Sequence, residues 1–195
     1  VEFAGIEAVT KEREVTLTWT TASETNNAGF TVEHRRLRTN AAGDTVQARS
    51  WNRLGFVEGT GTTDEPQAYR YKTGPLDYGP HAFRLRQVDT DGSMSLSDEV
   101  QADVRLNRPY DVSAPYPHPV RRATTVDLTV RKTQSVAVDV YDVLGRRVAV
   151  PFDEEVRGQQ TRSVPVDASR FASGVYFLRI RGETFRATER MTVVH

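Results

Sequence analysis

The residues of this chain best suited to catalysis or metal binding are its histidines, because imidazole titrates near neutral pH and is a common metal ligand. They stand far apart, at His34, His81, His118 and His195. No pair has the His-x-x-x-His spacing that places two ligands on one helical face. The chain also has no cysteine, which excludes disulfides, zinc–thiolate sites and cysteine nucleophiles. We expect no metal site and no histidine-based catalysis.

Other chemical motifs are incomplete. No Gly-x-Ser-x-Gly segment occurs, so a hydrolase nucleophile is not predicted. Gly59-x-Gly61 lacks the further residues of a phosphate-binding loop and is interpreted as part of a turn. Asp89-x-Asp91-Gly92 begins like a calcium loop, but Val100 stands where the closing glutamate is required. Asp153–Glu155 is interpreted as a solvated loop. The sequence therefore predicts a protein without catalytic residues or cofactors.

The composition is that of a globular protein with room for one large or two small domains. The chain has 195 residues, of which 37% are hydrophobic and 27% charged. No apolar run approaches the roughly 18 residues of a membrane-spanning helix, so we expect no membrane insertion. The start at Val1 shows no signal-peptide pattern, and we interpret the chain as a fragment or processed form.

The net charge of zero is unevenly distributed. Residues 1–105 contain 12 Lys and Arg against 16 Asp and Glu, and residues 106–195 contain 14 against 10. A surplus of four positive charges is too small to indicate nucleic-acid binding, for which a basic stripe is expected. The asymmetry instead favours two separate units. We expect the protein to be a monomer.

The first half has the pattern of an antiparallel β-sandwich. Val15, Leu17 and Trp19 alternate with threonines, which is the two-residue period of a half-buried strand. Similar strands are predicted at 30–35, 51–57, 69–71, 83–88 and 100–104, with a polar loop at 23–29, a second loop at 40–44 and a turn at 59–63. About seven strands in about 100 residues without a helical pattern indicate an immunoglobulin-like sandwich.

The second half predicts another all-β domain. Residues 105–114 lack periodicity and are interpreted as a linker, which gives domains at 1–104 and 115–195. Pro117 and Pro119 fix an extended start to the second domain. Six strands are predicted, at 124–130, 136–141, 147–150, 162–166, 174–180 and 185–194. The fold class expected is all-β, with two tandem antiparallel sandwiches.

A hairpin at Val140–Val148 is the best-defined local feature of this second domain. The alternation of Val136, Val138 and Val140 stops at Asp142 and resumes after Gly145. A glycine that ends such a turn is expected to have positive φ. Leu144 is unusual in a turn. It is compatible with either an inward core contact or an exposed recognition contact.

Two segments of the first half resemble a fibronectin type III-like module. They are Trp19–Glu33, which reads WTTASETNNAGFTVE, and Phe83–Gly92, which reads FRLRQVDTDG. The resemblance covers residues 1–104. It implies the sandwich fold predicted above and no specific activity.

Four ordered motifs of the second half together resemble the C-terminal sorting domain of the type IX (Por) secretion system. They are Tyr116-Pro117-x-Pro119, Val140–Val148, Ser173–Arg179 with the preceding Asp167-Ala168, and Arg190-Met191. The resemblance covers Ala114 to His195. His118 stands where the family usually has asparagine.

The resemblance implies an address rather than an enzyme. Such a domain is recognised by the outer-membrane translocation machinery, which carries folded cargo through the periplasm to the cell surface. A sortase-like peptidase then removes it, which places the expected cleavage in or near Arg105–Ala114. The first domain would be a spacer, and the cargo would be an upstream domain of the same chain. The resemblance thus implies a protein that is secreted or at the cell surface.

Each motif residue has a structural and a recognition interpretation. Gly145 and Gly174 are expected to serve turn geometry, Tyr176 and Phe177 to lie in the core, and Pro117 and Pro119 to shape the first segment. Leu144 remains open. Arg190 and its strand are the stronger recognition candidates, because a strand at a sheet edge can be bound by strand addition.

The alternative function is a cell-surface adhesion or carbohydrate-binding module. Its candidate surface is a predicted ladder in which Glu33 and Arg35 lie beside Arg84 and Arg86 on an outward face. We interpret this ladder as solvated charge pairs rather than a binding site. Trp51 is the candidate for sugar stacking, although burial is the favoured interpretation.

Overall fold

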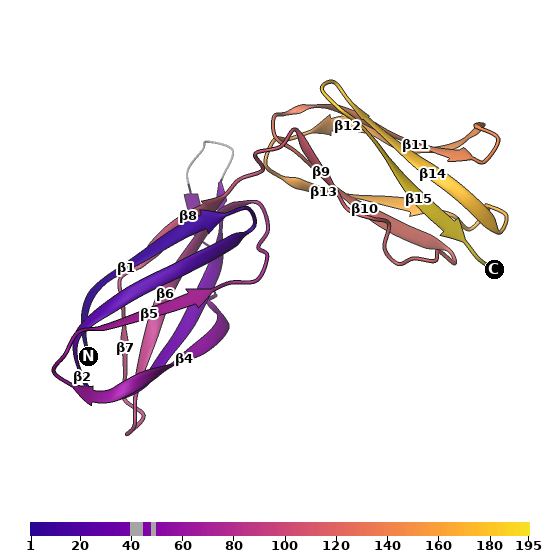
Figure 1. Ribbon diagram of the computed structural model, residues 1–195. Helices are drawn as coiled ribbons and strands as arrows, with labels where there is room; N and C mark the ends of the chain where they lie inside the picture. The colour runs from indigo at the N-terminus through magenta and orange to yellow at the C-terminus, as the bar shows by residue number, and fades with distance from the viewer. Residues whose placement is uncertain (40–44, 48–49) are drawn as a thin grey trace. The chain divides into compact units, whose positions relative to one another are not determined.

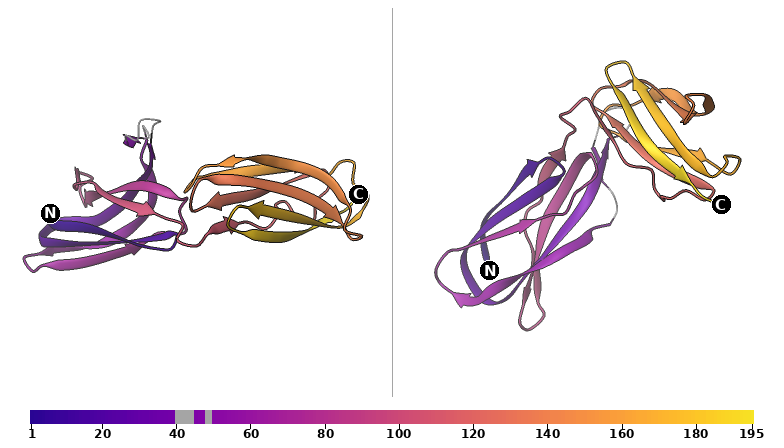
Figure 2. Two further views of the ribbon diagram at one scale, coloured as in Figure 1. Left: turned by 90° about the horizontal axis from the view of Figure 1, so that it is seen from above. Right: turned by 45° about the vertical axis from the view of Figure 1, so that its right-hand side comes forward.

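The computed structural model describes the backbone of residues 1–39, 45–47 and 50–195. It is all-β, with strands in several antiparallel sheets and no helix among these residues, which confirms the predicted fold class. The strands fall into two compact units, Val1–Arg105 and Leu106–His195 (Figure 1). Figure 2 shows each unit from two further directions. None of the described segments forms a helix long and apolar enough to cross a membrane.

The first unit is organised around one long strand that serves both of its sheets. The first half of this strand pairs with β1 and β5, and its second half pairs with β4 and β6. Leu17, Trp19 and Phe30 from this strand are buried, as are Phe83 and Leu85 of the neighbouring β6. The described strands are β1 (Glu2–Lys11), β2 (Glu14–Thr39), β3 (Thr45–Gln47), β4 (Asn52–Thr63), β5 (Gln67–Lys72), β6 (Gly79–Asp89), β7 (Met94–Leu96) and β8 (Val100–Val104).

The polar loop predicted at 23–29 is wrong, because these residues are the crossing point of β2 between the two sheets. Asn26 has φ of 54° and the pairing register shifts around Asn27 and Gly29. Glu24 and Asn27 are buried there, and their side chains hydrogen-bond to each other at 2.9 Å. Buried polar residues that hydrogen-bond to one another have the same composition as a surface loop, so the sequence alone does not distinguish the two.

Of two further loop predictions, one is wrong and the other falls outside the described residues. The turn predicted at 59–63 is the end of β4, where an added Cβ on Gly59 would lie 2.4 Å from the Asn27 amide nitrogen. Glycine is therefore required there by close approach rather than by a turn. The loop predicted at 40–44 lies outside the described residues.

The second unit consists of a three-stranded and a four-stranded sheet. The strand orders are β13-β10-β9 and β12-β11-β14-β15. All six predicted strands are present. The strands are β9 (Tyr110–Val112), β10 (Ala123–Val130), β11 (Gln134–Asp142), β12 (Arg147–Val156), β13 (Thr161–Asp167), β14 (Gly174–Gly182) and β15 (Arg186–Val193). The side chains between the two sheets are almost entirely apolar, with Val126, Leu128, Val138 and Leu178 at most 1% exposed.

Two parts of the second unit differ from the sequence-based interpretation. β9 lies inside the segment expected to be a linker, and it pairs with β10. Leu106 is 3% exposed, and its N–H donates to Gln159 Oε1 at 2.8 Å. Residues 153–155 are not a loop but the exposed end of β12, paired with residues 135–137 of β11. The alternation of apolar and polar residues is lost in both places, because a short strand or a strand at a sheet edge buries little of either face.

Candidate recognition surface of the second unit

The tip of the β11–β12 hairpin is built on one carboxylate. Asp142 Oδ1 accepts hydrogen bonds from the backbone N–H groups of Leu144 and Arg146, both at 2.9 Å. Arg146 Nε donates to Asp142 Oδ2 at 2.7 Å, and the Gly145 N–H donates to the Asp142 carbonyl at 3.0 Å. The bond from the Arg146 N–H is the main reason that the pKa of Asp142 lies below its usual value. Gly145 has φ of 76°, as the turn geometry predicted.

Leu144 points outward. Its exposed fraction is 74%, and that of the neighbouring Val143 is 67%. The tip is thus held by polar bonds to Asp142, and the two apolar side chains contribute nothing to its packing. Of the two interpretations that the sequence left open, the inward core contact is wrong, because the Leu144 side chain is exposed.

Three of the four motifs lie side by side in one sheet, at the end of the strands nearest this hairpin. Tyr141 of β11 pairs with Phe177 of β14, and Phe177 pairs with Arg190 of β15. In Figure 1, β14 lies between β11 and β15. The outer face of this sheet is open, because Phe177 is 37% exposed. The prediction that Phe177 is a core residue is therefore wrong, whereas Tyr176 on the opposite face is 9% exposed.

A buried aspartate lies beneath the arginines of this outer face. Asp139 is 1% exposed and accepts from Arg181 at 2.6 Å and from Arg147 at 3.4 Å. The Arg179 guanidinium carbon lies 4.6 Å from the ring centre of Tyr141, a cation–π contact. Sequence reasoning missed this network. The signal was an aspartate in an otherwise apolar alternating strand, opposite arginines on the strands that pair with it.

The Pro117–Pro119 segment brings the fourth motif to β15. Its two prolines follow cis peptide bonds. His118 Nε2 accepts a hydrogen bond from the Thr192 N–H at 3.2 Å. Val120 continues the contact, since its N–H donates to the Thr192 carbonyl and its own carbonyl accepts from Val194. His118 therefore supplies an acceptor to the edge of β15.

Tyr176 and Gly174 differ in what the fold requires of them. The Tyr176 hydroxyl donates to the Ala172 carbonyl at 3.0 Å, and its ring stacks on Phe171 with centres 5.0 Å apart. Gly174 has no positive φ, and an added Cβ would meet nothing nearer than the Ala172 carbonyl oxygen at 4.0 Å. The expected turn role of Gly174 is therefore not supported.

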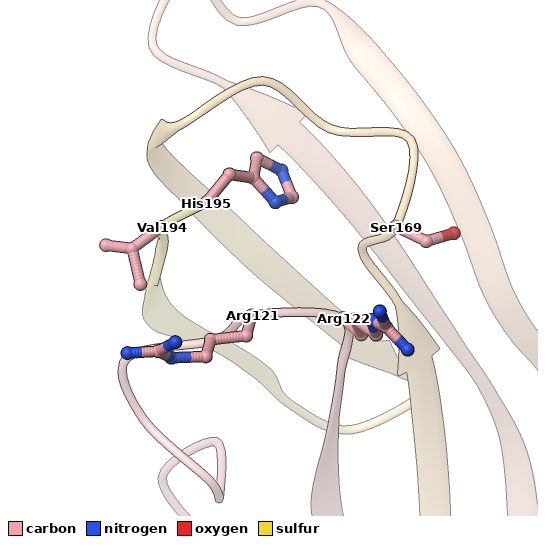
Figure 3. A pocket seen from close by; sticks show the side chains of 5 residues that line it. All are labelled: Arg121, Arg122, Ser169, Val194 and His195. Atoms are coloured by element: carbon pink, nitrogen blue, oxygen red, sulfur yellow. The ribbon is translucent and has the colours of Figure 1, made fainter.

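Two shallow pockets flank these motifs. One, of about 400 Å³, lies against Phe171, Ala172 and Tyr176, with Val148 at its edge. The other, of about 280 Å³, is lined by Arg121, Arg122, Ser169, Val194 and His195. In Figure 3 the two guanidinium groups of the second pocket lie on opposite sides and do not converge on one point. This arrangement does not define an anion site.

The charge ladder predicted in the first unit exists but is not solvated. Glu33 pairs with Arg84 in register, and their side chains are bonded at 2.8 Å. Glu33 and Arg35 are only 6% and 7% exposed. Trp51 covers them, since the guanidinium carbons of Arg35 and Arg84 lie 4.4 and 4.3 Å from the centre of its ring. These contacts indicate a structural role for the ladder.

The histidines of the first unit form a pair that the sequence did not predict. His34 Nε2 and His81 Nδ1 are 2.7 Å apart, and the other ring nitrogen of His81 lies 2.8 Å from the Asp77 carbonyl oxygen. Burial, with the neighbouring His81, lowers the pKa of His34 to about 4. In the described part of the chain, no three His, Cys, Asp or Glu side chains are grouped as metal ligands.

Comparison with known protein families gives a match within the second unit. Residues 114–194 match the family described as the secretion system C-terminal sorting domain. The match supports a type IX sorting domain in this part of the chain. It does not include residues 1–113, for which the fibronectin type III-like resemblance stays a prediction. No curated protein matched the chain.

Among solved structures, the chain is similar to dimeric latent PorU from Porphyromonas gingivalis. The sequence identity is 14% and the TM-score is 0.37. The similarity covers 99% of this chain and 20% of the PorU chain, so this chain spans a fifth of that protein's length.

Proposed function

We propose that the second unit is a non-catalytic address that delivers an attached cargo through the type IX secretion system to the cell surface. The family match over residues 114–194 carries this proposal. In this role the first unit is a spacer between the address and the cargo. The partners are the outer-membrane translocation machinery and a sortase-like peptidase.

The exposure of three motif residues supports recognition rather than packing as their role. Leu144 and Arg190 are exposed, and Gly174 is exposed without a conformational need for glycine. A folded domain read by a receptor must present its identifying side chains to solvent, often with apolar groups among them. The Val143–Leu144 tip fits this requirement.

The peptidase should cleave in or near the segment Arg105–Ala114. Within the expected segment Arg105–Ala114, Leu106 is buried and Tyr110–Val112 form β9. Asn107–Pro109 is exposed between them. A protease needs an accessible, extended backbone, so we place the candidate bond at or beside Asn107–Pro109. Mass spectrometry of the released fragments locates it.

The sorting role is tested by fusing a reporter ahead of residues 1–195 and, separately, ahead of residues 106–195. In a type IX-competent host both fusions should reach the cell surface, and in a matched strain without the translocation machinery neither should. Periplasmic retention of both fusions in the competent host would overturn the proposal. Delivery by the longer fusion alone would contradict the spacer role of the first unit.

A further inference from the structure

β15 is an open sheet edge, in contrast to the other described edges of the second unit. β12 contains Pro151 and pairs with β11 through shifted registers, β13 contains Pro165, and β9 has three residues. Prolines, irregularities and short length are the usual ways in which proteins prevent strand addition. β15 has eight residues, no proline and an unbroken register with β14.

The outward backbone groups of β15 follow from its pairing. The Gly182 N–H donates to the Phe185 carbonyl across the hairpin turn, so residues opposite each other alternate between bonded and non-bonded pairs along the ladder. By this alternation, Arg186, Thr188 and Arg190 direct their N–H and C=O groups away from β14. Thr192 confirms which residues of β15 direct their backbone groups outward, because its own N–H and C=O bond to His118 and Val120 rather than to β14.

Part of this edge already carries an added segment. Val120 forms a parallel bridge with Val193, and together with His118 it occupies the outward groups of Thr192. Thr188 and Arg190 continue the same edge and are exposed. No hydrogen-bond partner outside β14 is recorded for their backbone groups among the described residues. An incoming strand therefore has about five residues of edge on which to pair, from Arg186 to Arg190.

The side chains along this edge select the chemistry of the partner. Arg186 and Arg190 lie on the outer face on either side of Thr188, and neither forms an ion pair within the described part of the chain. A second copy added antiparallel around Thr188 would place Arg186 opposite Arg190 twice, and like charges directly opposite are destabilising. A shift of two residues leaves the arginines as diagonal neighbours. Charge complementarity instead favours an acidic strand.

We propose that the free edge of β15 binds an extended acidic segment of a partner protein by strand addition. Carboxylates spaced four residues apart on the incoming strand would lie opposite Arg190 and Arg186, and backbone bonds to Thr188 would form between them. The partner protein would be one that recognises the sorting domain, so the biological role of this edge rests on the sorting function proposed above. Its binding chemistry is testable by itself.

The test uses the chain of residues 1–195 and two nine-residue peptides rich in Thr and Val, with either Glu or Lys at positions 3 and 7. Titration followed by NMR should show the Glu peptide binding and shifting the amide signals of Arg186, Thr188 and Arg190. Thr188→Pro removes one outward N–H without touching the bonds to β14, and binding should weaken about tenfold. Thr188→Val, which keeps that N–H, is the matched control and should bind as well as the parent.

A charge-reversed variant keeps the proposal testable if Thr188→Pro does not fold. Arg186→Glu combined with Arg190→Glu should exchange the preference, so that the Lys peptide binds more tightly than the Glu peptide. Equal binding of both peptides to the parent chain, or shifts confined to residues outside β15, would overturn the proposal. Because the titration needs no secretion machinery, a failure here leaves the export test unaffected, and a failure of export leaves peptide binding unaffected.

Discussion

The two units differ in how many charged or titratable side chains they bury. Among the described residues, the first unit buries Glu24, Glu33, Arg35 and His81, each in contact with polar or aromatic partners. The second unit has an apolar core with one buried charge, Asp139. Large apolar side chains are exposed in the described parts of both units: Val9, Phe56, Met94 and Leu96 in the first, and Tyr116, Val143, Leu144, Val148, Val150 and Phe177 in the second.

In the second unit, the residues that stabilise the fold are not the residues that we propose for recognition. Buried polar networks make the first unit's fold sensitive to single changes and to pH. In the second unit the core is apolar, and the motif residues Leu144 and Arg190 lie outside it on the surface. Mutations should therefore affect stability in the first unit and in the core of the second, but not at the exposed Val143 and Leu144 side chains of the hairpin tip.

The largest loss of stability is expected from Leu178→Ala. Leu178 is fully buried in the centre of the four-stranded sheet, and its truncation should lower the unfolding free energy of the second unit by about 2–5 kcal/mol. Urea unfolding of residues 106–195 measures this. Leu144→Ala removes the same atoms from an exposed site and should change stability by less than about 0.5 kcal/mol. A large loss of stability in both variants would show that the Leu144 side chain packs against other residues of the fold.

Glu24→Gln should destabilise the first unit by about 1–3 kcal/mol, because a charged acceptor of several buried bonds is replaced. Glu24 accepts from Thr21, Asn27, the Thr60 N–H and Tyr69. Burial alone would raise the pKa of Glu24, but these bonds outweigh it and hold the pKa below the usual value. Trp19 and Trp51 are the two tryptophans of the chain, so tryptophan fluorescence follows this unit alone. An unchanged unfolding midpoint would contradict the network's role.

The first unit should also lose stability on acidification below about pH 6.5. Burial lowers the pKa of His34 to about 4, whereas in the unfolded chain a histidine titrates near 6.5. Between these values the unfolded state binds the extra proton, so the stabilisation is complete above pH 6.5 and declines toward pH 4 by up to about 1.4 kcal/mol per pH unit. Tryptophan-monitored urea unfolding at pH 7, 6 and 5 measures the slope. His34→Phe should flatten it; an equal slope in this variant would assign the effect elsewhere.

The smallest stability effects compare two glycines of the second unit. Gly145→Ala should cost about 1 kcal/mol, because alanine is strained at φ of 76°. Gly174→Ala should cost less than about 0.5 kcal/mol, since its φ is ordinary and its surroundings are open. Thermal unfolding of both variants of residues 106–195 provides the comparison. Similar losses at both positions would mean that Gly174 also serves the fold.

The strands could be predicted from sequence wherever burial alternates along the chain. The six strands expected in the second unit are present, because Val, Leu and Ile face one core in each. Prediction failed where polar residues are inside, as at Glu24 and Asn27, and where apolar residues are outside, as at Phe177. The alternation of apolar and polar residues reflects the chemical type of each side chain. It does not show which residue that side chain contacts.

The candidate site could be predicted only as a set of positions. Gly145 was assigned to the turn because positive φ has a sequence signature. That Tyr141, Phe177 and Arg190 are neighbours required the pairing register of three strands. The contact of His118 with Thr192 joins residues 74 positions apart, and no local pattern encodes such a contact.

The central claim is that the second unit is an address read at exposed residues that its packing does not need. Its most direct test is the fraction of a reporter delivered to the cell surface when the fused chain carries Leu144→Ala, measured together with the melting temperature of residues 106–195. The account predicts a severalfold fall in surface delivery with an unchanged melting temperature. Delivery equal to that of the parent chain would contradict it.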